Sequence, residues 1–123
     1  MPRKILVVED HSDDRELLII QLRRMRYEAI GAESAEEGLE KAASEAPDLI
    51  IMDLGLPGIN GIEATTRLKR NPKTSHIPVI AFTAWNETRY KEKALQAGMA
   101  GFLSKPTPPQ VLRQIIDKFL QEV

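Results

Sequence analysis

The sequence contains no cysteine, which excludes disulfide bonds, thiolate nucleophiles and cysteine-based zinc or iron–sulfur sites. Its two histidines, His11 and His76, are too few for a histidine-rich metal site. No apolar run approaches the roughly 20 residues of a membrane-spanning helix, and the first residues lack the pattern of a signal peptide. We therefore expect a soluble cytoplasmic protein that has no membrane as a partner.

The sequence also lacks an excess of charge of either sign. Its 17 lysine and arginine residues oppose 18 aspartate and glutamate residues, and the formal net charge is −1. Because a surface that binds nucleic acid or an acidic membrane is usually strongly basic, we expect no nucleic acid as the main partner. At 123 residues, the chain is expected to form a single domain over residues 1–123.

Short apolar runs alternate along the chain with amphipathic segments of helical periodicity. We expect strands at residues 5–8, 28–31, 49–52, 79–82 and 101–103. A capping residue followed three positions later by Glu or Gln predicts helix starts at Asp13, Ser34, Asn60 and Thr107. Five strands alternating with helices predict a doubly wound α/β fold, in which helices cover both faces of a parallel sheet.

Asp53 is the most informative residue, because it places an ionisable carboxylate at the end of the apolar run 49–52. The carboxyl ends of parallel strands share one edge of the sheet, where such folds bind ligands. Other polar or turn-forming residues follow the remaining strands at this edge: Glu9 and Asp10, then Thr83 and Ala84, then Ser104, Lys105 and Pro106. The sequence therefore predicts one site built from several strand ends.

The charges of this site predict a bound cation. Three carboxylates, Glu9, Asp10 and Asp53, oppose the single ammonium of Lys105, which leaves a net charge of −2. Because the available ligands are oxygens, Mg²⁺ fits best, and a backbone carbonyl just after Asp53, at Gly55, could add a ligand. Such a site suits phosphoryl transfer, with Asp53 as a nucleophile that forms an aspartyl phosphate.

In these residues the chain resembles the receiver (CheY-like) domain of two-component response regulators, over essentially its whole length. The resemblance implies a flavodoxin-like five-stranded parallel sheet in the order 2-1-3-4-5, with five helices. It also implies a role for each site residue: Glu9 and Asp10 as the Mg²⁺-binding acidic pair, Asp53 as the phosphoacceptor, Thr83 as the switch hydroxyl, Lys105 as the phosphate-binding lysine, Phe102 as the switch aromatic, and Pro106 after a cis peptide bond.

The chain departs from the commonest pattern of this family at three positions. Glu9 replaces the more usual aspartate of the acidic pair and is longer by one methylene group. Gly55, two residues after Asp53, has no side chain and leaves the phosphoryl group open to water on that side. Phe102 lacks a hydroxyl, so its switching would depend on packing alone.

Trp85 is the most suggestive residue outside the site, because it lies two positions after Thr83 in the loop that begins with Ala84. One interpretation is a half-buried tryptophan packed under its own loop. The other is an aromatic anchor for a partner, since tryptophan is enriched at interface hot spots. We place Trp85 with Phe102, Ala84 and Pro106 on the expected switch and partner surface.

The resemblance implies a phosphorelay regulator that is not an enzyme beyond its own phosphorylation and dephosphorylation. Its phosphoryl group would come from a phosphohistidine on a cognate histidine kinase or histidine phosphotransfer protein. Phosphorylation would then change the surface of the fourth helix, fifth strand and fifth helix for a downstream protein target. We expect a stand-alone, single-domain regulator, and a homodimer through the fourth and fifth helices remains open.

Two other classes of protein compete with this interpretation. A flavodoxin-like enzyme or nucleotide binder would carry a dinucleotide or P-loop fingerprint, and neither is present. A phosphatase that forms an aspartyl phosphate would place a second aspartate where Gly55 stands. A phosphorylation-independent pseudo-receiver that only docks partners would usually lack part of the acidic set or the lysine, and this chain has both.

Overall fold

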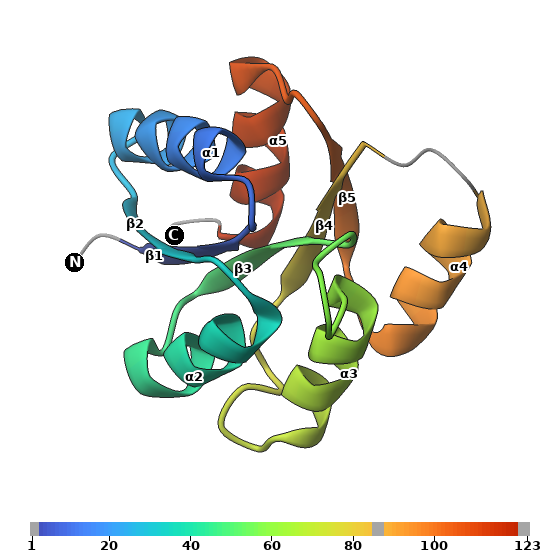
Figure 1. The fold of residues 1–123 in the computed structure, drawn as a ribbon. Helices are drawn as coiled ribbons and strands as arrows, with labels where there is room; N and C mark the ends of the chain where they lie inside the picture. The colour runs from blue at the N-terminus through green and yellow to red at the C-terminus, as the bar shows by residue number, and fades with distance from the viewer. Residues whose placement is uncertain (1–2, 85–87, 121–123) are drawn as a thin grey trace.

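The protein folds as a parallel sheet of five strands with helices on both faces, in a computed structural model that describes residues 3–84 and 88–120 (Figure 1). The strands are β1 Lys4–Val8, β2 Glu28–Ala32, β3 Leu49–Asp53, β4 Val79–Thr83 and β5 Gly101–Ser104. The helices are α1 Ser12–Arg24, α2 Ala35–Glu45, α3 Gly61–Arg70, α4 Thr88–Ala97 and α5 Pro109–Phe119. The strand order β2-β1-β3-β4-β5 confirms the predicted doubly wound α/β class.

The helices form two layers, with α1 and α5 on one face of the sheet and α2, α3 and α4 on the other (Figure 1). Alternate strand residues supply the two cores, because successive side chains of a strand point to opposite faces. On β1, Ile5 and Val7 pack toward α1 and α5, whereas Leu6 and Val8 pack toward the other helices. The central strands β3 and β4 are buried along their whole length. This accounts for the continuous apolar runs of the sequence.

Two of the four predicted helix starts are confirmed. The Ser34 hydroxyl accepts a hydrogen bond from the Glu37 N–H at 3.1 Å, and the Asn60 carboxamide oxygen accepts one from the Glu63 N–H at 3.0 Å. Each side chain therefore satisfies a backbone donor that the first turn of a helix leaves unpaired.

The starts predicted at Asp13 and Thr107 are wrong. Helix α1 already begins at Ser12, and His11 takes the N-cap position without a side-chain hydrogen bond to the helix. At α5 the Thr107 hydroxyl donates instead to the Ser104 carbonyl, and the N-cap falls on Pro108. Asp13 therefore lies two residues past the N-cap of α1, and Thr107 lies one residue before the N-cap of α5.

The turn after β3 brings the start of α3 against the end of that strand. The Gly61 N–H donates to the Leu54 carbonyl at 3.2 Å. A Cβ atom at Gly61 would overlap the carbonyl oxygen of Asp53, so only glycine fits this close approach. The backbone of Asp53 is thus held by packing as well as by the sheet.

None of the helices within residues 3–84 and 88–120 combines the length and hydropathy that crossing a membrane requires.

Candidate functional site

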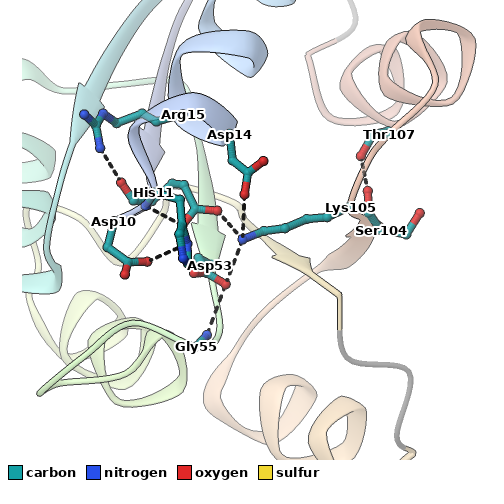
Figure 2. Close-up of polar contacts among 10 residues, drawn as sticks. Asp10, His11, Asp14, Arg15, Asp53, Gly55, Ser104, Lys105 and Thr107 are labelled. Carbon is teal, nitrogen blue, oxygen red and sulfur yellow. Dashed lines mark hydrogen bonds and ion pairs between the residues drawn. The ribbon is translucent and has the colours of Figure 1, made fainter.

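The carboxylates of Glu9 and Asp53 meet at the carboxyl edge of the sheet. Figure 2 shows Asp53 there together with Lys105, Asp10 and His11. Glu9 follows β1 directly and is fully buried, while Asp53 is the last residue of β3 and is 5 % exposed. The Lys105 ammonium pairs with Glu9 Oε1 and lies 3.5 Å from Asp53 Oδ1. Three strand ends that are far apart in sequence therefore contribute to one cluster of charges.

Lys105 enters this cluster from the segment after β5. Its backbone N–H donates to the Thr83 carbonyl at 3.2 Å, and its ammonium lies 5.0 Å from the centroid of the Phe82 ring. Burial by itself lowers the pKa of Lys105, but the hydrogen bond to Glu9 and the charges of the surrounding carboxylates outweigh burial and raise that pKa above its ordinary value. Lys105 is therefore a firmly protonated cation.

The pKa of Glu9 is also raised, although for a carboxyl group this favours the neutral form. Its burial raises the pKa, the hydrogen bond from Lys105 lowers it, and the neighbouring Asp53 carboxylate raises it again. The net pKa of Glu9 is above the ordinary value for glutamate. The contribution of Asp53 shows that the two carboxylates repel each other, and a further cation would relieve that repulsion.

Asp10 and His11 complete the cluster on the side away from Lys105. Among the described residues, Asp10 Oδ1 is a buried side-chain oxygen without a hydrogen-bond partner. The ligand atoms of Glu9, Asp10, His11 and Asp53 all lie within 4.8 Å of one another. An unsatisfied buried oxygen among carboxylates fits a hard divalent cation such as Mg²⁺.

Gly55 lies beside the Asp53 carboxylate. Its backbone N–H donates to Asp53 Oδ1 at 3.1 Å, and the residue is exposed. The interaction that the structure describes is thus made by the N–H of Gly55. The prediction that its carbonyl binds a metal stays a prediction.

The remaining predicted residues lie around the cluster. Thr83 ends β4 and is buried, next to the exposed Ala84. Phe102 is half-buried on the α4 side of the sheet, where the Lys91 ammonium is 5.9 Å from its ring centroid. Pro106 is exposed, and the Lys105–Pro106 peptide bond is cis, as the resemblance implied. Trp85 lies outside the described residues.

Two further residues, Asp14 and Arg15, lie close to the cluster and were not predicted from the sequence. Asp14 Oδ2 is 4.0 Å from the Lys105 ammonium, and Arg15 Nη1 donates to the backbone carbonyl of Glu9 at 2.8 Å (Figure 2). Both lie in the first turns of α1, within five positions of Asp10. This proximity was the available signal, although it does not reveal which way the side chains point.

Arg15 connects the acidic loop to β2. Its side chain is only 13 % exposed, and Nη2 lies 3.4 Å from Glu33 Oε1, just beyond β2. The Glu9 N–H also donates to the Ala32 carbonyl at 3.0 Å. Both backbone polar groups of Glu9 are therefore fixed, which holds the acidic pair at the end of β1.

We expect Arg15→Lys to weaken Mg²⁺ binding by about tenfold, because lysine cannot make both contacts and the acidic pair loses its support. Isothermal titration calorimetry measures the affinity. Arg23→Lys is the matched control, since Arg23 Nη2 donates to the Ala29 carbonyl at 3.1 Å at the far end of the same helix. Equal Mg²⁺ affinities for the two variants would contradict the supporting role of Arg15.

This fold and charge cluster define a class of signalling domain, and comparison with known proteins identifies it. Residues 5–117 match the response regulator receiver domain, and the chain belongs to this family. It is a receiver domain of two-component signalling, a signalling module rather than a classical enzyme, and this family implies a histidine kinase as partner.

Two curated relatives have different lengths. The polar-differentiation response regulator DivK of Brucella anthropi is 37% identical over 106 residues, covering 86% of this chain and 86% of that protein. The phosphate regulon transcriptional regulatory protein PhoB of Pseudomonas aeruginosa is 36% identical over 110 residues, which is 89% of this chain but 48% of that protein. The chain thus spans about half the length of PhoB and most of DivK.

Two solved structures share the fold. The chemotaxis protein CheY4 of Vibrio cholerae has a TM-score of 0.93 at 26% identity, covering 98% of this chain and 100% of that one. The receiver domain of the sensor histidine kinase PA1611 of Pseudomonas aeruginosa has a TM-score of 0.89 at 28% identity, covering 97% and 98%. That domain has a magnesium ion coordinated in its active site cleft.

Proposed function

We propose that the chain accepts a phosphoryl group on Asp53 from a phosphohistidine of a histidine kinase or histidine phosphotransfer protein. The observation that carries this proposal is the placement of the Asp53 carboxylate. It lies at the carboxyl edge of the sheet, with Oδ1 held by the Gly55 N–H and facing the Lys105 ammonium. The other carboxylate oxygen, Oδ2, is the atom we assign as the nucleophile.

The proposed reaction transfers one phosphoryl group from nitrogen to oxygen. Asp53 Oδ2 attacks phosphorus in line with the donor bond, so a P–O bond forms while the P–N bond breaks. The electron pair of the broken bond stays on the imidazole nitrogen of the donor, and the donor leaves as a neutral imidazole because its other ring nitrogen carries a proton when the bond breaks. Lys105 offsets the negative charge of the phosphoryl oxygens, and the Thr83 hydroxyl donates to one of them.

Glu9, Asp10 and Asp53 are the residues that would hold Mg²⁺, with the Gly55 carbonyl as a further proposed ligand. Asp10 Oδ1, which is buried and has no hydrogen-bond partner among the described residues, supports this assignment. When bound, the ion neutralises charge on the transferred phosphoryl group. In its absence, Lys105 alone faces three carboxylates, so we expect little phosphoryl transfer without a divalent cation.

The proposed surface for protein partners is formed by α4, β5 and α5. We propose that movement of Thr83 toward the phosphoryl group vacates space that Phe102 enters, and that Ala84, Trp85 and Pro106 join the changed surface. Phosphorylation must favour this arrangement by a few kcal/mol to shift the population. Proteins, rather than nucleic acid or membrane, are the proposed targets, in the cytoplasm.

Labelling with a small-molecule phosphodonor tests the proposed function. In the presence of acetyl phosphate and Mg²⁺, intact-protein mass spectrometry should detect the addition of one phosphoryl group. Chelation of Mg²⁺ should remove the labelling, because the carboxylate cluster then repels the incoming anion. No labelling with Mg²⁺ present would contradict the proposal and favour a docking module that works without phosphorylation.

A further inference from the structure

The imidazole of His11 faces the acidic pair. Its Nδ1 atom lies 3.5 Å from Glu9 Oε2 and 3.5 Å from Asp10 Oδ1 (Figure 2). Glu9 presents a different oxygen to each neighbour, since Lys105 contacts Oε1 and His11 faces Oε2. His11 thus adds a nitrogen atom to a cluster that otherwise offers only oxygen.

The backbone of His11 is held by hydrogen bonds, and its side chain does not cap the helix. His11 is the N-cap of α1, but its side chain makes no hydrogen bond to that helix. Its backbone N–H donates to Glu9 Oε2 at 3.2 Å, and its carbonyl accepts from the Arg15 N–H at 3.0 Å. The side chain is 71 % exposed, so the ring can adjust without repacking the core.

The distances from His11 Nδ1 to the Glu9 and Asp10 oxygens are close to those expected between two ligands of one metal ion. An ion about 2.1 Å from two ligands separates them by about 3.0 Å at a right angle and by about 3.4 Å in a tetrahedral arrangement. The separations of 3.5 Å from Nδ1 to the two carboxylates are close to the second value. One of these oxygens, Asp10 Oδ1, is buried and lacks a hydrogen-bond partner among the described residues, so it can still accept a metal ion.

We propose that His11 Nδ1 is a metal ligand that shifts the preference of this site from Mg²⁺ toward divalent cations that favour nitrogen, such as Zn²⁺ and Cu²⁺. The inference rests on the metal site of the proposed function and concerns its selectivity. Mg²⁺ prefers oxygen and gains little from an imidazole, whereas Zn²⁺ and Cu²⁺ bind imidazole strongly. The imidazole nitrogen therefore raises the affinity for Zn²⁺ and Cu²⁺ much more than the affinity for Mg²⁺.

Affinity measurements on His11→Gln test this selectivity. Glutamine keeps a polar side chain but removes the imidazole nitrogen. Titrations against a chromophoric chelator should show a loss of about tenfold or more in Zn²⁺ affinity. Mg²⁺ affinity, measured by calorimetry, should change by about twofold or less. His76→Gln is the matched control, because His76 is the only other histidine and is exposed outside the cluster.

Electron paramagnetic resonance of bound Cu²⁺ gives a second readout that a purely structural role of His11 would not change. The wild-type protein and His76→Gln should both show splitting from an imidazole nitrogen at one equivalent of Cu²⁺. His11→Gln should lose that splitting. The same result from all three proteins would overturn the assignment of Nδ1 as a ligand.

Stronger metal binding by His11→Gln would also overturn the inference. If His11 acts only as a positive charge that balances the carboxylates, His11→Gln should strengthen the binding of Mg²⁺ and Zn²⁺ alike. Acetyl phosphate labelling of the wild-type protein with Mg²⁺ separates this outcome from failure of the proposed function. Labelling together with equal Zn²⁺ affinities overturns only the inference about His11, whereas His11-dependent Zn²⁺ binding without labelling overturns only the phosphoacceptor role.

Discussion

Asp53→Asn should abolish phosphoryl incorporation from acetyl phosphate in the presence of Mg²⁺. The amide oxygen is a far weaker nucleophile than the carboxylate, and the substitution also removes one of the three negative charges that would hold the cation. In the wild-type protein the Lys105 ammonium is 3.5 Å from Asp53 Oδ1. In the variant it would no longer lie beside a nucleophilic carboxylate. Intact-protein mass spectrometry should detect no phosphorylated species above the background of the untreated variant.

Asp48→Asn is the matched control for this experiment. Asp48 lies directly before β3, whereas Asp53 ends it, so the two aspartates lie at opposite edges of the sheet. Asp48 Oδ2 accepts a hydrogen bond from the Lys4 N–H at 2.8 Å and takes no part in the charge cluster. We expect this variant to be labelled as the wild-type protein is. Labelling of Asp53→Asn at the wild-type level would place the acceptor at another residue.

Lys105→Met should lower the free energy of unfolding by about 3 kcal/mol when divalent cations are chelated. Methionine matches the length of the lysine stem and keeps its packing, but Glu9 then loses the ammonium that pairs with its Oε1. Glu9 is fully buried, and a buried charge without a partner is strongly destabilising. Urea unfolding measured by circular dichroism gives the difference directly.

The destabilisation by Lys105→Met should be smaller in acid. A group whose pKa is raised in the folded state contributes stability below its ordinary pKa and loses it as pH rises through the raised value. The pKa of Glu9 is already raised by burial, and removing the Lys105 hydrogen bond that lowers it raises it further. At a pH below the ordinary glutamate pKa, Glu9 is neutral and the missing ammonium matters less.

Lys93→Met provides the control, because Lys93 is an exposed residue of α4. Its unfolding free energy should stay within about 0.5 kcal/mol of the wild-type value at both pH values. Adding Mg²⁺ should restore part of the stability of Lys105→Met, since the ion would supply the missing positive charge. A loss of stability that is the same at neutral and acidic pH would exclude the unpaired Glu9 charge as its cause.

Two of the four helix caps could be predicted from the local sequence, and two could not. Ser34 and Asn60 cap their helices as their sequence patterns indicated, because each pattern is complete within four residues. Asp13 and Thr107 carry similar patterns without acting as caps. Asp13 lies two residues past the N-cap of α1, and the Thr107 hydroxyl, one residue before the N-cap of α5, donates to the Ser104 carbonyl instead of accepting from the helix.

The strands, the α/β class and the edge at which the acidic residues gather could all be predicted from the sequence. Apolar runs and helical periodicity are local properties, and residues at the ends of parallel strands must share an edge. Asp53, Glu9 and Lys105 could therefore be assigned to one site without coordinates.

The atoms that meet at this edge depend instead on how the helices and loops pack in three dimensions. Lys105 and Glu9 are 96 positions apart, and no periodicity specifies that the ammonium pairs with Oε1 while His11 faces Oε2. Arg15 contacts the Glu9 carbonyl because α1 leaves β1 at a particular angle, which depends on the packing of α1 against the sheet. Side-chain direction in loops and first helical turns is set by such packing, and for this reason the sequence predicted the site but not its individual contacts.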